Sequence, residues 1–102
     1  MSQREGAAAL ADAERLLLAS EQDPAVARAA ALAALRALLL EWGQTPRTDT
    51  IVGLLEQVAE TDETVEQFRA EAAVLDRFNP GPDASERAKI FVDAARARLA
   101  NI

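Results

Sequence analysis

An all-α fold is predicted for this chain: an antiparallel up-and-down bundle of four main helices with one short helix inserted. Half of the 102 residues are apolar, most of them Ala and Leu, and aromatic residues make up only 4%. Such a composition favours helices and lacks the β-branched and aromatic residues that build strands. Apolar residues also recur every three to four positions, as on one face of a helix. At this length we expect one domain, residues 1–102.

The bundle is expected to be built around residues 23–43, which are predicted to form one helix with both ends marked. Asp23 is a good N-cap, because its carboxylate can accept hydrogen bonds from the first turn. Pro24 suits the first helical position, where its missing N–H costs nothing. Gly43 can take the left-handed conformation that ends a helix.

This central helix is apolar on nearly every side. From Ala29 to Leu40 the only non-apolar residue is Arg36. A helix of this kind is buried on nearly every side, so we expect other helices, or another copy of the chain, to surround it. We expect the Arg36 stem to pack while its guanidinium reaches solvent or a carboxylate. The functional alternative is a polar position in a ligand cleft.

The first helix is expected over about residues 3–22, with Leu10, Ala13 and Leu17 on its buried face. The link to the central helix is short, so these two helices should be antiparallel neighbours. A third, short helix is expected over about residues 49–59. Its buried face is predicted to contain Ile51, Leu54, Leu55 and Val58.

Thr48 or Thr50 can cap the third helix, and Gly53 indicates either a weak point or a close contact with a neighbouring helix.

The fourth helix is expected over about residues 63–78. Its apolar stripe is Val65, Phe68, Ala72, Leu75 and Phe78. Its other face is acidic, and we interpret it as solvated, with a docking surface for a basic partner as the alternative.

A Pro- and Gly-rich segment, residues 78–82, must break the fourth helix. The last helix is expected to start at a cap, Asp83 or Ser85, and to run to about Ala100. Its apolar face is predicted to contain Ala88, Phe91, Val92, Ala95, Leu99 and Ile102. Its polar face is basic, which predicts attraction to the acidic fourth helix within the chain or between subunits.

The amino-acid composition limits the reactions that this chain could catalyse and the metal ions that it could bind. The chain has no Cys, His or Tyr, so it lacks the commonest general base and the thiolate and imidazole metal ligands. No phosphate-binding glycine loop is present. We therefore expect no enzymatic activity, no cofactor and no metal. The net charge of −6 opposes DNA binding. The sequence carries no secretory or membrane-spanning signature, so we expect a cytoplasmic protein.

Residues 34–57, ALRALLLEWGQTPRTDTIVGLLEQ, resemble the core of HEPN domains (higher eukaryotes and prokaryotes nucleotide-binding). In those domains a helix carries a lysine before an apolar quartet. A loop with Gly and Pro, a Thr-His-Asp-Leu-like helix start and paired leucines follow. The similar positions here are Arg36 in place of the lysine, Ala37–Leu40, Gly43, Pro46, Thr48, and Leu54 with Leu55. Residues 75–78 and 82–83 are similar to the family's Leu-Asp-Arg segment and the turn after it.

The chain departs from the family at its polar positions. The Gln, Glu and Lys that the family carries on the second helix fall on Ala29, Leu32 and Ala33, and its His falls on Asp49. The Arg-x4-6-His ribonuclease motif of toxic members cannot occur without His. The tyrosine that some members present to a partner nucleotidyltransferase is also absent. The resemblance therefore implies a member that keeps the bundle and has lost the polar site.

What the resemblance implies is a non-catalytic, bacterial protein-interaction subunit. We expect a homodimer, and the partner class that the resemblance implies is a minimal nucleotidyltransferase in a toxin–antitoxin-type pair. The alternative is a degenerate module that binds a nucleotide or another small ligand near Arg36, Arg47 and Arg77. A second alternative is an enzyme whose chemistry the sequence does not reveal.

Overall fold

Helices form the whole described part of the chain apart from its connecting loops. The structure is a computed structural model that describes residues 2–77, 81 and 83–99. The elements in chain order are α1 (Ser2–Ala19), the 3-10 helix η1 (Ser20–Gln22), α2 (Pro24–Glu41), α3 (Ile51–Ala59), the 3-10 helix η2 (Glu63–Phe68), α4 (Arg69–Leu75) and α5 (Ala84–Leu99). No strand occurs in those ranges, so the predicted all-α bundle is confirmed.

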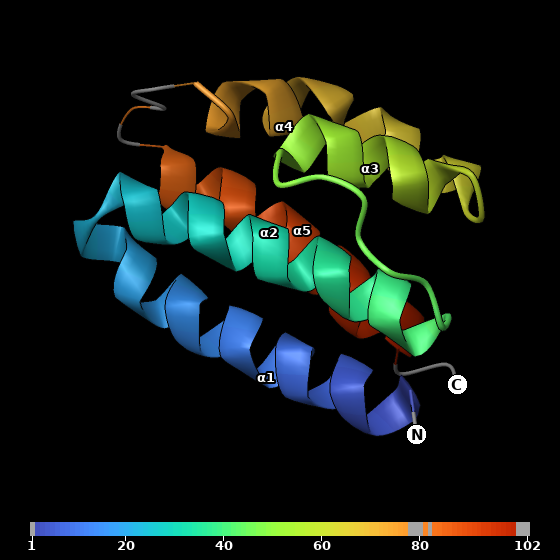
Figure 1. Ribbon diagram of the computed structural model, residues 1–102. Coiled ribbons are helices and arrows are strands. Elements are labelled where there is room, and N and C mark those ends of the chain that lie inside the picture. Colours follow the sequence, from blue (N-terminus) through green and yellow to red (C-terminus); the bar gives the residue numbers. More distant parts are fainter. Residues whose placement is uncertain (1, 78–80, 82, 100–102) are drawn as a thin grey trace.

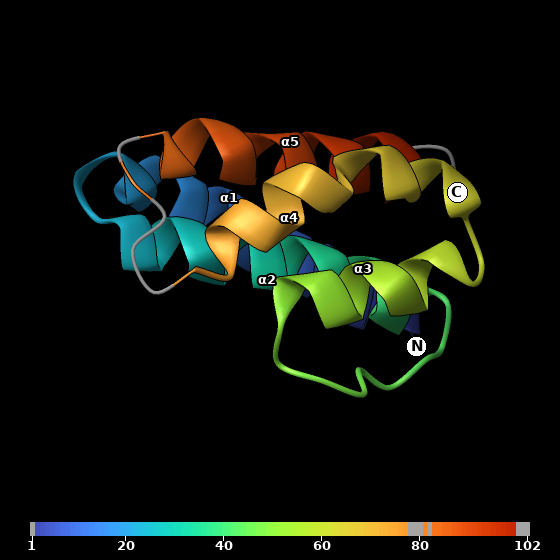
Figure 2. The same ribbon diagram turned by 90° about the horizontal axis from the view of Figure 1, so that it is seen from above.

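The helices are arranged in three layers, with α2 and α5 in the middle one (Figure 1). Helix α1 packs against one side of α2 and also contacts α5. Helices α3 and α4 form the layer on the opposite side, where α3 packs on α2 and α4 on α5 (Figure 2). The predicted antiparallel packing of α1 and α2 is seen directly in this arrangement. Among the described helices, none combines the length and the apolarity needed to cross a bilayer.

Both predicted ends of α2 are confirmed. The Asp23 carboxylate accepts a hydrogen bond from the Ala25 N–H at 2.9 Å, and Pro24 takes the first helical position. At the other end Gly43 has a φ of +72°. The N–H of Gly43 bonds to the Leu40 carbonyl and that of Gln44 to the Leu39 carbonyl. These two bonds form a Schellman motif, which satisfies the last carbonyls of the helix.

The helical periodicity correctly predicted the core. The four apolar residues predicted for α3 are fully buried, and so are Ala88, Phe91, Val92 and Ala95 of α5. Phe68 is half-buried and meets Phe91 edge-to-face, with ring centroids 6.1 Å apart. Phe78, Ala100 and Ile102, which the sequence also assigned to helices, lie outside the described residues.

The fourth helix differs from its prediction. Residues 63–68 are wound as a 3-10 helix and only Arg69–Leu75 is α-helical, so the α-helix is shorter than expected. The 3-10 segment starts at Asp62, whose carboxylate accepts a hydrogen bond from the Thr64 N–H. The tighter winding has three residues per turn. It turns the buried Val65 and the half-buried Phe68 toward α3 and α5.

Ser85 was predicted as a possible cap for α5, and its hydroxyl has a different partner. It lies 2.8 Å from the hydroxyl of Ser20, which is almost fully buried and also donates to the Leu17 carbonyl. The two hydroxyls thus join η1 to the first turn of α5. A buried hydroxyl without a partner would be costly, so this pairing explains why two serines are tolerated there.

Candidate functional site

One face of α2 is only partly covered by the other elements of the chain. Nine residues of α2 are buried against α1, α3 and α5. Seven further residues are half-buried; apart from Arg28 and Glu41 they follow a spacing of three and four, which places them on one side of the helix. We call this face the α2 stripe: Val26, Ala29, Ala33, Arg36 and Leu40. The expectation that α2 is buried on nearly every side agrees with its contacts to α1, α3 and α5, and the α2 stripe is the face that stays half-buried within this chain.

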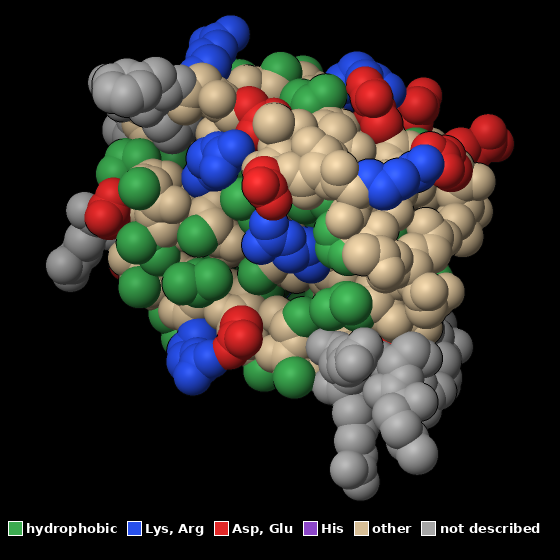
Figure 3. All heavy atoms as spheres, in the orientation of Figure 1, with side chains coloured by type: hydrophobic (Ala, Val, Ile, Leu, Met, Phe, Trp, Pro, Cys, Tyr) green, Lys and Arg blue, Asp and Glu red, His purple; other side chains and the backbone are tan. Residues whose placement is uncertain are grey.

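Figure 3 shows this face of the molecule. Hydrophobic side chains follow the diagonal along which α2 runs in Figure 1, and charged side chains gather where α2 meets the loop before α3. The stripe is about 21 Å long at 1.5 Å per residue. Two of its five residues are alanines, which let another helix approach closely.

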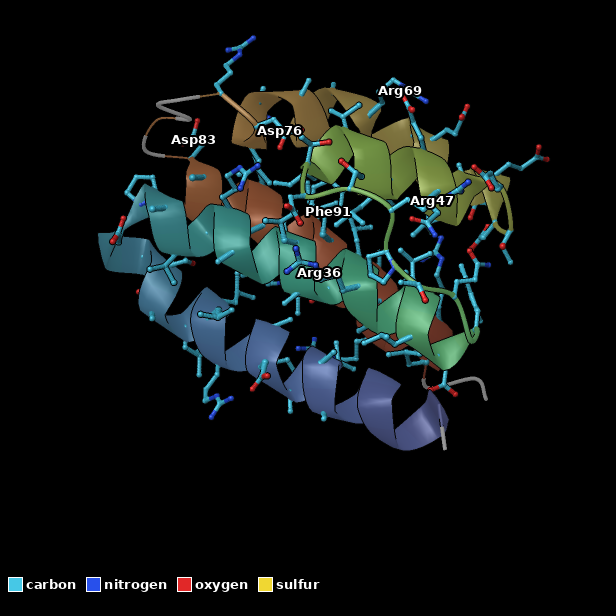
Figure 4. The ribbon with its side chains drawn as sticks, viewed as in Figure 1. Arg36, Arg47, Arg69, Asp76, Asp83 and Phe91 are labelled. Carbon is cyan, nitrogen blue, oxygen red and sulfur yellow. The ribbon has the colours of Figure 1, made fainter. Side chains whose placement is uncertain are left out.

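Two arginines of α2 converge on Asp49, in the loop before α3. The Arg36 guanidinium lies 3.2 Å from the Asp49 carboxylate, and Arg28 donates to the Asp49 carbonyl at 3.3 Å. The Asp49 side chain is 94% exposed and that of Arg36 is 39% exposed. Arg36 thus reaches a carboxylate, as the structural interpretation of the sequence expected. Figure 4 shows Arg36 on the open face of α2.

A second carboxylate lies at the same place but is held differently. Asp76, which follows α4, accepts hydrogen bonds from the N–H groups of Ile51 and Val52, both at 2.9 Å. Arg28 lies 3.3 Å from the same carboxylate, whose side chain is only 18% exposed. Asp76 therefore caps the N-terminus of α3 from another helix, where a negative charge is favourable. Thr50 completes the cap by accepting from the Gly53 N–H.

Arg47 pairs with a different carboxylate from Arg36. Its guanidinium lies 2.7 Å from Glu60, which caps the C-terminal end of α3. Its backbone N–H donates to the side chain of Gln57, which is almost fully buried. Gln57 also donates to the Thr45 carbonyl, so it fastens the extended loop along α3. These contacts assign Arg47 to the anchoring of that loop.

Arg77 is exposed and follows the inward-turned Asp76. Within the described residues its side chain makes no ion pair. The three arginines predicted for a ligand site therefore have separate surroundings: Arg36 meets Asp49, Arg47 meets Glu60, and Arg77 faces solvent. The residues that do meet Arg36 at the open face are Asp49 and, through it, Arg28.

Sequence reasoning missed the roles of Arg28 and Asp76. A signal for Arg28 was available, because it precedes Arg36 by two helical turns and so lies on the same side of α2. Asp76 stands in the segment that resembles the family's Leu-Asp-Arg motif. That it caps α3, 25 residues earlier in the chain, could not be read from spacing alone.

The most strongly perturbed carboxyl lies elsewhere, at the start of η2. Hydrogen bonds from the Thr64 hydroxyl and from Arg98 hold the pKa of Asp62 below its usual value. Arg98 of α5 lies 2.6 Å from Asp62 and also donates to the Thr64 hydroxyl at 2.8 Å. This is one contact of the predicted acidic–basic attraction between the fourth and fifth helices, and it occurs within the chain. These contacts are explained by anchoring, without a ligand.

The described residues contain no group of three acidic side chains placed to hold a metal ion. A family model, that of the HEPN domain, matches residues 2–83 of the chain, from α1 to just before α5. No curated protein and no solved structure matches the sequence significantly.

Proposed function

The chain belongs to the HEPN domain family, and from that premise we propose that it is a non-catalytic HEPN domain acting as a dimeric protein-interaction subunit. The observation that carries this proposal is the α2 stripe. The longest apolar run of the sequence lies in α2, yet one face of this helix stays only half-buried, with small residues where another helix would cross. Exposed apolar faces of this kind are typical of interaction surfaces.

The residues present favour a non-catalytic role. The ionisable groups described around Arg36 are Arg28, Asp49 and Asp76, in which each carboxylate contacts an arginine. Arg stays protonated at neutral pH, so it cannot act as a general base. Hydrolysis of a phosphodiester by this chain alone would lack a proton acceptor matched to neutral pH.

Nucleotide binding is supported less well than the proposed protein interaction. The N-terminus of α3 is the natural place for a phosphate near Arg36, since free N–H groups there attract anions. Two of those N–H groups already bond to Asp76, and Arg28 already contacts the same carboxylate. A phosphate would have to displace this intramolecular anion.

The partner class implied by the family resemblance is a minimal nucleotidyltransferase, in the cytoplasm of a bacterium. A basic partner surface would meet the acidic side formed by α3 and η2. Glu63 is exposed there, and Glu56 and Glu66 share Arg69. Two carboxylates around one guanidinium leave this side with a net negative charge, which favours association with a basic surface.

Sedimentation analysis of the wild type tests the dimer. The variant Ala33→Glu places a charge at the centre of the α2 stripe, and we expect it to weaken dimerisation at least about tenfold. Ala70→Glu, at an exposed position of α4, is the matched control and should leave the dimer intact. A wild type that stays monomeric at high concentration would overturn the proposal.

Calorimetric titration with nucleotides distinguishes the proposed interaction subunit from the alternative, a nucleotide-binding module. Heat at micromolar to millimolar nucleotide that disappears in Arg36→Gln would favour ligand binding at the α2 stripe. We expect no heat, because Asp76 already occupies the N-terminus of α3.

A further inference from the structure

Resting on the proposed dimer, we propose that the occupant of the α2 stripe is a second copy of this chain and that Arg36 of each copy pairs with Asp49 of the other. The exchange would place two reciprocal ion pairs in the dimer interface. It would also define the alignment of the two α2 helices. The argument starts from the state of this pair in the single chain.

Within one chain the Arg36–Asp49 pair is loosely held. One guanidinium nitrogen contacts one carboxylate oxygen at 3.2 Å, and the Asp49 side chain is 94% exposed. Asp76, which contacts Arg28, has three donors and is 18% exposed. Asp49 therefore keeps unused acceptor capacity that points to solvent, whereas Asp76 does not.

The position of Asp49 suits a symmetric contact. Arg28 and Arg36 are two turns apart on α2, roughly 12 Å, and both contact Asp49. Asp49 therefore lies beside the middle of the α2 stripe, near the level of Ala33. In a twofold dimer each patch meets itself, so residue i contacts residue j while j contacts i. A twofold axis near Ala33 brings Asp49 of the second copy to the opposite side of the stripe, within reach of Arg36.

The charges of this face favour a second copy over an unrelated helix. Arg36 is a cation among apolar residues, and covering the stripe would remove its guanidinium from water. A buried guanidinium needs a carboxylate, and the planar guanidinium of Arg can donate two hydrogen bonds to one carboxylate. Any partner must supply an anion opposite Arg36 and a cation opposite Asp49. This chain carries both on the same face.

The exchange also compensates an unfavourable overall charge. Each chain has a net charge of −6, so two copies repel each other at long range. Two opposite-charge contacts at the closest approach offset that repulsion locally. Charge pairs of this kind determine which surfaces dock and in which alignment.

A mixing experiment with charge-swapped variants tests the exchange. Arg36→Asp puts two anions at the contact in its homodimer, and Asp49→Arg puts two cations there. We expect each variant alone to dimerise at least about tenfold more weakly than the wild type. Mixed in equal amounts, one chain carries both anions and the other both cations, so the mixture should form heterodimers in large excess over either homodimer. Native mass spectrometry of chains with different tags measures this ratio.

The matched control is the Lys89–Asp93 pair of α5, which is also exposed and lies off the stripe. The mixture of Lys89→Asp with Asp93→Lys should show no preference for heterodimers. The double variant Arg36→Asp with Asp49→Arg restores an ion pair whether it forms within or between chains. Recovery in this double variant without heterodimer preference in the mixture would therefore overturn the exchange.

A wild-type dimer whose single variants stay dimeric, with a statistical mixture, would contradict the exchange and leave the proposed dimer standing. A monomeric wild type would overturn both. If a swapped variant fails to fold by circular dichroism, Arg36→Gln with wild-type Asp49 replaces it. The wild-type dimer should weaken with rising salt, and Arg36→Gln should lose most of that salt dependence. An equal salt dependence in both proteins would count against the exchange.

Discussion

The α3–α4 layer is joined to the rest of the bundle by a carboxylate at each end, and the two joints differ. At the N-terminus of α3, Asp76 accepts two backbone N–H groups and contacts Arg28. At the start of η2, Asp62 accepts from Thr64 and Arg98. The first carboxylate joins α4 to α3 through the backbone of α3, and it reaches α2 through the side chain of Arg28. The second caps η2 through the Thr64 N–H and reaches α5 through the side chain of Arg98. The same residue type thus serves as a remote helix cap in one place and as an ion-pair anchor in the other.

This difference indicates that the hydrogen-bond donors around an aspartate, more than its charge, determine how much it contributes to the stability of the fold. Backbone N–H groups at a helix end cannot move away when their acceptor is removed. A guanidinium that loses its carboxylate can turn to water. We therefore expect the two joints to respond very differently to substitution, and the following changes are ordered by the size of the expected effect.

Removal of the Asp76 carboxylate should have the largest effect. In Asp76→Ala the N–H groups of Ile51 and Val52 lose a charged acceptor and Arg28 loses a partner. We expect a loss of roughly 2–3 kcal/mol in the free energy of unfolding. Urea denaturation followed by circular dichroism measures it. Glu66→Ala, at an exposed position, is the control and should change little; an equal loss in both would show that Asp76 is no special cap.

The close packing at the N-terminus of α3 also makes the replacement of Gly53 by alanine unfavourable. Ala usually stabilises a helix by about 1 kcal/mol relative to Gly. At Gly53 an added Cβ would lie 2.5 Å from the Thr48 side chain and 2.7 Å from the hydroxyl of the capping Thr50. We expect Gly53→Ala to destabilise the protein by about 1 kcal/mol, because the cap must shift. A thermal melt at or above the wild-type midpoint would contradict this. The sequence indicated a weak point or a close contact with a neighbouring helix at Gly53; the close contact is instead with Thr48 and Thr50, which precede α3 in the chain.

The smallest effect is expected at the other joint, and it depends on pH. Asn at position 62 keeps an oxygen for the Thr64 N–H and loses the charge that Arg98 contacts. We expect Asp62→Asn to cost about 1 kcal/mol at pH 7. The pKa of Asp62 is lower in the folded protein than its unperturbed value of 3.8. A lowered pKa contributes stability above the unfolded pKa, and this contribution is lost as the pH falls through the folded pKa.

The difference in unfolding free energy between wild type and Asp62→Asn should therefore shrink when the pH is lowered from 7 to below 3. Denaturation curves at several pH values in this range measure it. A difference that stays constant over the range would mean that the charge of Asp62 contributes nothing to the joint. The Glu60→Gln variant, in the exposed pair with Arg47, is measured over the same range as the control.

Local signals predicted the helix ends well. Asp23, Pro24 and Gly43 mark α2 through bonds to residues within four positions, and all three act as expected. The winding of residues 63–68 was not predicted, because the choice between a 3-10 and an α-helix there depends on how Val65 and Phe68 meet α3 and α5. Ser85 was misjudged for a similar reason: its partner, Ser20, is 65 residues away.

The candidate site likewise has one part that the sequence predicted and one part that it could not predict. Arg36 stood out in the sequence as the polar residue in an apolar run, and it does lie on the open face. That Asp49, and neither Arg47 nor Arg77, would lie beside it was beyond the reach of the sequence, because the course of the loop before α3 is set by Gln57 and Arg47 contacts.

By itself the sequence determined that this chain is an all-α bundle, where its central helix begins and ends, and which residues of each helix are apolar. These properties depend on neighbours within one or two turns. Only the tertiary structure decided which face of α2 stays open and that Asp76 caps α3 from another helix. Helix periodicity indicates that an apolar face must be covered; the packing of the helices decides what covers it, and it leaves the α2 stripe half-buried.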